Sequence, residues 1–198
     1  MTRTQSHPAL YWIVALLWLA GAIAFAATGR LAELAPPVPQ LIVGALTVAL
    51  ILAGALLPGF RVWLAGLNIR QIIFFHVLRF VGIWFLILGA RGELAASFAT
   101  PAGWGDIAVA AAALAITLFV PDLYAHRGIV VGWNLLGLAD LILAVATASR
   151  AALADRASMA PIVHLPLAIV PLFLVPLLFA SHVLLFFRVR KEPEPGPA

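Results

Sequence analysis

Two charged residues, Arg79 and Asp140, lie deep inside apolar stretches at residues 71–90 and 128–148. An isolated Arg or Asp near the centre of a membrane-spanning helix costs about 2.5–3.5 kcal/mol on insertion scales, so each should face the interior of a bundle and find a partner. The two residues differ in depth by a distance that a long arginine side chain spans. We expect them to pair, either as a structural ion pair or as a pair that opens to bind a ligand or a proton. An anionic ligand would suit Arg79.

Two further polar side chains belong to the same expected site. His76 precedes Arg79 by three residues, so both project from one face of a helix. Asn134 lies in the same stretch as Asp140 and is suited to hydrogen bonding between helices. The expected ligand-binding set is therefore Arg79, Asp140, His76 and Asn134.

A second interpretation assigns His76 to a cofactor. His182 lies in the apolar stretch at residues 162–187, at about the depth of His76. Two neutral imidazoles at matched depth on facing helices could ligate the iron of haem b, and Arg79 could then serve a propionate. The alternative is that each histidine bonds to a neighbouring backbone carbonyl and holds no cofactor.

Asp106 and His164 form a candidate pair at the opposite side of the membrane. The segment Thr100–Asp106 opens a fourth apolar stretch at residues 103–120, so Asp106 is expected in the first turn of a helix, where a carboxylate meets the helix dipole favourably. His164 lies near the start of the sixth stretch, at a similar depth. The two side chains could therefore form a periplasm-facing polar pair.

Apolar helices must position all of these side chains. The chain of 198 residues is 64% hydrophobic and only 10% charged, far from the roughly 25% charged residues of soluble domains. A bilayer core needs about 20 apolar residues per helix. Six stretches meet that length, at residues 10–28, 40–57, 71–90, 103–120, 128–148 and 162–187. The prediction is an all-α polytopic transmembrane helix bundle of about six spans, forming one domain over residues 1–190.

Prolines set the sixth stretch apart. They recur every fifth residue, and each one inside a helix removes a backbone hydrogen bond and exposes a carbonyl one turn earlier; they are Pro161, Pro166, Pro171 and Pro176. Freed carbonyls at membrane depth must be satisfied by neighbours, water or an ion. We expect one proline-kinked helix, either as a working element or as a plain kink.

Charge at the helix ends predicts the orientation. Lys and Arg are more numerous in the termini and the even-numbered loops than in the odd-numbered loops, which places both termini in the cytoplasm of a multi-pass inner-membrane protein. The net charge of +4 is explained by topology and anionic lipid, so no nucleic-acid partner is implied. The first stretch is too long for a secretory signal and is expected to remain as a helix. The tail at residues 191–198 is expected to be disordered.

Three segments carry a family resemblance. HVLRFVGIWF, PAGWGD and WNLLGLADL make the carboxy-terminal two thirds of the chain similar to small uncharacterised multi-pass proteins of bacterial inner membranes. The resemblance implies a location and no activity. The sequence has no cysteine, no glycine-rich phosphate loop and no catalytic motif, so enzymatic chemistry is unsupported.

Three functions remain open at this point. The first is a small permease or ligand-binding membrane protein with a central polar site for a small molecule or ion. The second is an electron-transfer protein holding haem b through His76 and His182. The third is a structural or assembly subunit of a membrane complex, in which Gly128 and Gly132 could equally mediate a homodimer.

Overall fold

The computed structural model describes residues 8–190, which form helices and turns and contain no strand. The elements are α1 (Pro8–Ala27), α2 (Arg30–Glu33), α3 (Val38–Leu56), α4 (Pro58–Gly66), α5 (Ile69–Phe75), the 3₁₀ segment η1 (His76–Val81), α6 (Gly82–Ala90), α7 (Ala96–Phe119), α8 (Arg127–Ala154), the 3₁₀ turn η2 (Ala157–Met159), α9 (Ala160–Val163), the π-helical segment η3 (Val170–Leu174) and α10 (Val175–Arg190). The predicted tail at 191–198 lies outside the described residues.

Six of the helical stretches are long and apolar enough to cross a membrane. They are Pro8–Ala27, Val38–Leu56, Ile69–Ala90, Ala96–Phe119, Arg127–Ala154 and Val170–Val189. The predicted number of spans agrees with this finding, and the bounds of the first three spans agree to within a few residues. The fourth helix begins earlier than predicted, the fifth ends at Ala154 and not at residue 148, and the sixth begins later than predicted.

The fourth helix begins earlier than predicted. Pro101 was expected before the helix, but α7 starts at Ala96 and contains it. A proline in the second turn removes only one intrahelical hydrogen bond, and the helix start is held by Ala95, whose N–H donates to Ser158 O at 2.9 Å. Asp106 consequently lies well inside α7 and not in its first turn.

The sixth stretch is interrupted, where one helix from residue 162 was predicted. Helix α9 ends at Val163, residues 164–168 form a turn, and the helical path resumes through η3 into α10. Pro176 removes the N–H that would bond to Leu172 O in an α-helix, and Trp18 of α1 donates its Nε1–H to that carbonyl at 3.1 Å. A neighbouring side chain therefore satisfies this carbonyl.

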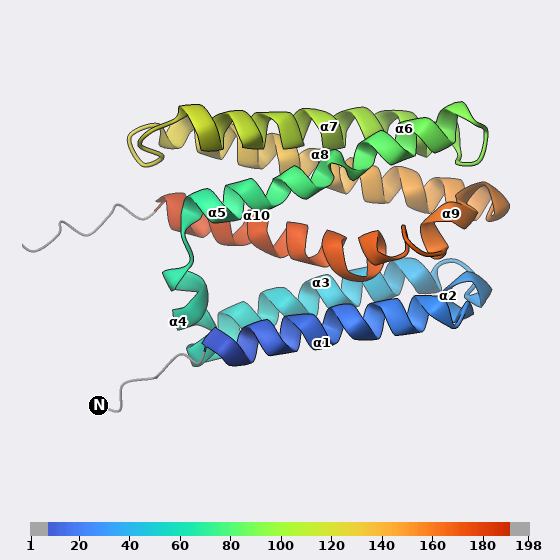
Figure 1. The fold of residues 1–198 in the computed structure, drawn as a ribbon, viewed down its shortest axis with the longest axis horizontal. Coiled ribbons are helices and arrows are strands. Elements are labelled where there is room, and N and C mark those ends of the chain that lie inside the picture. Colours follow the sequence, from blue (N-terminus) through green and yellow to red (C-terminus); the bar gives the residue numbers. More distant parts are fainter. Residues whose placement is uncertain (1–7, 191–198) are drawn as a thin grey trace, which may run out of the picture.

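The helices are arranged in three layers (Figure 1). Helices α6, α7 and α8 lie at one side, α5 and α10 lie in the middle, and α1 and α3 lie at the other side. Helix α7 packs on α6, η1 and α8, whereas α10 packs on both α8 and α3. The start of α1 and the end of α10 lie at the same end of the bundle, as an even number of crossings requires.

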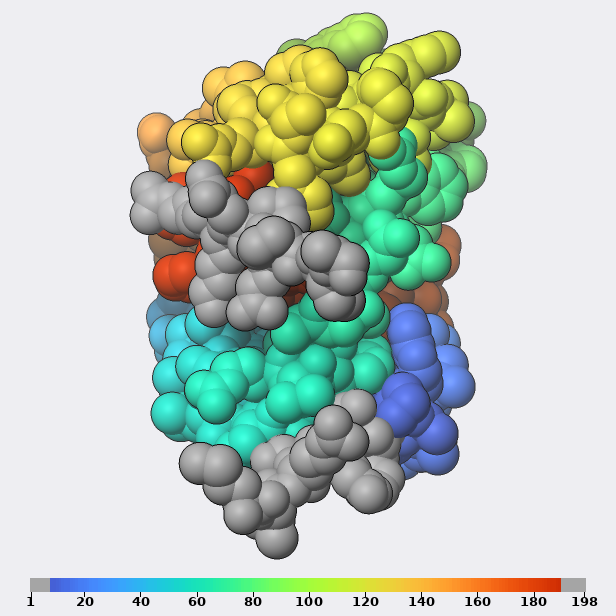
Figure 2. All heavy atoms as spheres, turned by 90° about the vertical axis from the view of Figure 1, so that its left-hand side faces the viewer, coloured from blue at the N-terminus to red at the C-terminus, as the bar shows by residue number. Residues whose placement is uncertain are grey.

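Two arginines donate hydrogen bonds to the connections at that end of the bundle. The α7–α8 connection and α4 form much of the surface that Figure 2 shows. Arg70 donates to Val120 O at 2.7 Å and to Pro121 O at 2.9 Å, beside its contact with Thr117 O. Arg188 donates to Leu67 O. Both residues satisfy backbone carbonyls at helix ends, which would otherwise lack a partner.

Two core clusters of buried apolar residues join α7 and α8 to the elements packed on them, and a third joins α1 and α2 to η3 and the turn before it. Ala99, Ala102, Ala110 and Ala113 of α7 are essentially inaccessible, so neighbouring helices approach α7 closely. Helix α3 has no buried residue, and large apolar side chains cover the outer faces of α1, α3 and α8. Such continuous apolar exterior marks a surface that is covered by something other than water.

Candidate functional site

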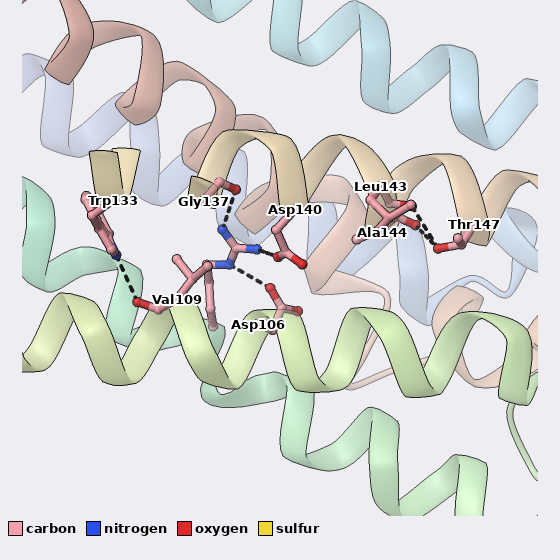
Figure 3. Close-up of polar contacts among 9 residues, drawn as sticks. Asp106, Val109, Trp133, Gly137, Asp140, Leu143, Ala144 and Thr147 are labelled. Atoms are coloured by element: carbon pink, nitrogen blue, oxygen red, sulfur yellow. Dashed lines mark hydrogen bonds and ion pairs between the residues drawn. The ribbon is translucent and has the colours of Figure 1, made fainter. Parts of the chain in front are cut away.

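Arg79 lies at the centre of a three-residue charge cluster. Its partners Asp106, Asp140 and Gly137 are labelled in Figure 3. Its side chain is 0% exposed. Its Nε–H donates to Asp106 Oδ1 at 2.6 Å, one Nη donates to Gly137 O at 3.0 Å, and the other Nη donates to Asp140 Oδ2. The cluster thus joins η1, α7 and α8 in the interior of the bundle. The predicted pairing of Arg79 with Asp140 is present, and Asp106 is a second carboxylate that sequence reasoning placed elsewhere.

Glycines make room for the cluster. A Cβ on Gly82 would lie 2.6 Å from Gly103 O and 2.7 Å from the Cβ of Asp106, so the start of α6 and α7 touch backbone to backbone there. A Cβ on Gly105 would overlap the carboxylate of Asp140. These close approaches let two aspartates on neighbouring helices reach one guanidinium.

The cluster contains more negative than positive charge. One guanidinium faces two carboxylates, so the set carries a formal charge of −1 when both aspartates are ionised. An uncompensated charge in a low-dielectric interior is costly, and the balance is restored by one proton or by a cationic group. Since Arg79 already donates to both carboxylates and to Gly137 O, the anionic ligand expected from the sequence does not suit it.

A second buried polar group lies beside the cluster. His76 and His182 are both 0% exposed, and their ring centroids are 4.3 Å apart with the planes tilted by 52°. Trp133 packs edge-on against His76 with centroids 5.0 Å apart and donates its Nε1–H to Val109 O at 3.1 Å. Gly137 permits this packing, because a Cβ there would lie 2.7 Å from the His182 ring.

Hydrogen bonds indicate which nitrogen of each imidazole carries the proton. Ser181 donates its hydroxyl to Leu178 O at 2.8 Å, so it accepts from His76 Nε2 at 3.0 Å. Asn134 donates its Nδ2–H to His182 O at 3.0 Å, so its Oδ1 accepts from His182 Nδ1 at 2.8 Å. In neutral imidazoles the proton then lies on His76 Nε2 and His182 Nδ1, and the other two ring nitrogens, His76 Nδ1 and His182 Nε2, are buried without a hydrogen-bond partner.

The ring contact does not fit the haem interpretation. A bis-histidine haem places the porphyrin plane and its iron between the two axial imidazoles. The rings of His76 and His182 instead pack directly on one another at the separation of an ordinary aromatic pair. The geometry assigns these histidines to a packed polar core.

The predicted pair of Asp106 and His164 is not formed. Asp106 is buried against Arg79, whereas His164 is exposed and its Nδ1 lies 2.8 Å from Ala160 O of its own segment. The error follows from the two boundaries: α7 begins earlier than predicted, and His164 lies in the turn after α9.

Two residues of the polar core were missed as site residues. Ser181 orients His76, and its position next to His182 in an apolar stretch was the available signal. Trp133 lies near the start of α8, and it is buried between helices, where its Nε1–H donates to Val109 O.

An apolar cavity of about 150 Å³ reaches the charge cluster. Its walls come mainly from α3, α8, η3 and α10, with further residues from α6, α7 and the segment at residues 156–163. Arg79 and Asp106 are the two lining residues that belong to the cluster, and Asp140 is not among the lining residues. The other polar lining residues are Gln40, Ser149 and Arg156. The space is only partly enclosed by the protein, so it is accessible from the surface of the bundle. The combination is a ligand-sized apolar space with a carboxylate on its wall.

Comparison with known proteins gives a family and no named relative. No curated protein and no solved structure matches the chain. The sequence motifs predicted an uncharacterised family, and the match that was found agrees with this prediction. The match indicates neither a bacterial nor a membrane location. A family model described as a domain of unknown function, DUF8737, covers residues 36–190, so the chain belongs to that family.

Proposed function

We propose that this protein is a small integral membrane protein of the bacterial inner membrane. It binds a small molecule at its central polar site and acts as a permease for that molecule. Six helices long and apolar enough to cross a bilayer, with apolar outer faces, support the membrane location. The excess of Lys and Arg at the end that carries both described termini supports a cytoplasmic position for that end.

One observation carries the assignment of the site. Asp106 lies on the wall of the apolar cavity and shares the single cation Arg79 with Asp140, whose side chain is 16% exposed. Charges buried in a membrane interior are costly to place, and where they occur they mark ion and substrate paths or proton relays. A site with a formal excess of one carboxylate favours a cationic or hydrogen-bond-donating ligand, or a ligand that moves with a proton.

The test is a ligand screen on the purified full-length protein in a mild detergent. Thermal unfolding is measured with a panel of small organic cations, neutral hydrogen-bond donors and organic anions, for the wild type and for Asp106→Asn. A cation or donor should raise the unfolding midpoint of the wild type and fail to raise that of a folded Asp106→Asn protein. Asp155→Asn, which changes an exposed aspartate just after α8, is the matched control and should behave as the wild type.

Two results would contradict the proposal. The first is a panel in which no compound shifts the midpoint. The second is a shift that Asp106→Asn retains. In either case the charge cluster is a structural ion pair that holds three helices together.

A further inference from the structure

The shape and lining of the cavity narrow the class of ligand that it takes. The cavity follows α8 from Leu141 to Ala152, which is about 16 Å of helix, and its volume is close to that of an engineered cavity that admits benzene. It is therefore elongated along α8 and only partly enclosed, and has room for an unbranched chain or a small ring.

The two ends of the cavity differ. At the Leu141 end, Asp106 and Arg79 are on its wall. From there to Ala152, the contributions of η3 and α10 are apolar, and α8 adds only Ser149 as a polar residue, whose hydroxyl donates to Val145 O at 2.7 Å. The other polar lining residues are Gln40 of α3 and Arg156, which follows α8 and donates to Ala32 O. An occupant that satisfies both regions carries a polar head at one end and an apolar chain behind it.

Charge selects the head group. A carboxylate or phosphate head would add negative charge to a cluster that already holds two aspartates and one arginine. An ammonium or hydroxyl head would donate to Asp106, and an ammonium would also restore the charge balance.

We propose that the ligand is a single-chain amphiphile with a cationic or hydrogen-bond-donating head, seated with the head at Asp106 and the chain along α8 between α3 and α10. This inference rests on the proposed function and specifies its ligand. The amphiphile reaches such a site from the bilayer, where its chain is already dissolved.

The test uses full-length protein in lipid nanodiscs and four probes: octylammonium, ethylammonium, octanol and octanoate. Binding is measured by native mass spectrometry of protein released from the discs. Octylammonium should bind about tenfold or more tightly than ethylammonium, because its chain is buried. It should also bind about tenfold or more tightly than octanoate, because octanoate repels the cluster, and octanol should fall between the two.

A matched pair of variants locates the chain. Ala148→Phe fills the cavity without touching the charge cluster, and Ala146→Phe adds the same ring on the exposed face of α8, two residues away. Ala148→Phe should lower octylammonium affinity about tenfold, and Ala146→Phe should leave it unchanged.

The outcomes separate this inference from the proposed function. Binding that depends on Asp106 but not on chain length or Ala148→Phe would overturn the amphiphile and leave the polar site standing. Equal binding of octanoate and octylammonium would overturn the head-group assignment and indicate nonselective filling by any bilayer chain. Loss of all binding in the wild type would overturn both proposals.

Discussion

Asp106 of α7 and Asp140 of α8 share one guanidinium, that of Arg79, although 34 residues separate the two aspartates along the chain. Asp106 lines the apolar cavity, and Asp140 does not. The same cation therefore holds a carboxylate that faces the cavity and a carboxylate that faces the seam between α7 and α8. This arrangement makes the cluster both a packing element and a candidate ligand site, and the two roles give different results on mutation.

Replacing Arg79 with Gln should strongly destabilise the protein. The change leaves two buried carboxylates without their cation, and breaking a buried ion pair from one side costs about 3–5 kcal/mol. Denaturation in mixed detergent–SDS micelles measures the loss. Arg150→Gln, an exposed arginine near the end of α8, is the control and should change stability by less than about 0.5 kcal/mol. A loss below about 1 kcal/mol for Arg79→Gln would contradict the cluster as described.

Removing one carboxylate should have a much smaller effect than removing both. Asp140→Asn leaves Arg79 and Asp106 as a balanced pair, and the Asn oxygen still accepts from Arg79, so stability should stay within about 1 kcal/mol of the wild type. The double change Asp106→Asn with Asp140→Asn leaves a buried arginine uncompensated and should cost about 3 kcal/mol or more. The same SDS titration measures both. If the single variant loses as much stability as the double variant, both carboxylates are ionised in the wild type and a bound cation balances their charge.

Gly137→Ala should disturb the contact between α8 and α10. The added Cβ would lie 2.7 Å from the His182 ring and 3.1 Å from Val109, and overpacking of this kind costs about 1–3 kcal/mol. Gly132→Ala in the same helix is the matched control, because nothing lies within 4 Å of its added Cβ. That control should be neutral or should stabilise the helix by about 0.5–1 kcal/mol. Equal responses of the two glycines would mean that α8 and α10 are farther apart than described.

Asp122, in the exposed connection between α7 and α8, should make that connection acid-sensitive. Its Oδ1 accepts from the N–H groups of Ala125 and Tyr124, and these hydrogen bonds lower the pKa of the Asp122 carboxyl below its usual value. A lowered folded-state pKa stabilises the ordered turn above the unfolded value of about 3.9, and that stabilisation is lost as the pH falls through the folded value. The turn should therefore be unchanged from pH 7 to pH 5.

Amide hydrogen exchange at Tyr124 and Ala125, corrected for intrinsic rates, measures this effect. Protection should fall only below about pH 4 in the wild type. Asp122→Ala should show low protection at every pH. Protection in the wild type that falls already between pH 7 and pH 5 would assign the effect to a group other than Asp122.

Which parts of the site could be predicted depends on whether the information is local. The pairing of Arg79 with Asp140 follows from depth along two helices, and depth is a count of residues from a span end. The placement of Asp106 failed because it depends on where α7 begins, and that boundary is stabilised by a contact from Ala95 to Ser158, far away in the sequence. The haem interpretation failed similarly, because matched depth does not say whether two rings are apart or in contact.

The sequence by itself determined that the chain forms six long apolar helices, because the length of an apolar run and the charges that interrupt it are local properties. It also determined which few polar residues must be partnered inside the bundle, since burial of a charge is costly wherever its neighbours lie. Only the tertiary structure decided which neighbours they find. The rotation of each helix, the backbone contact of Gly82 with Gly103 and the cavity beside Asp106 arise from packing between helices, which no single stretch of sequence specifies.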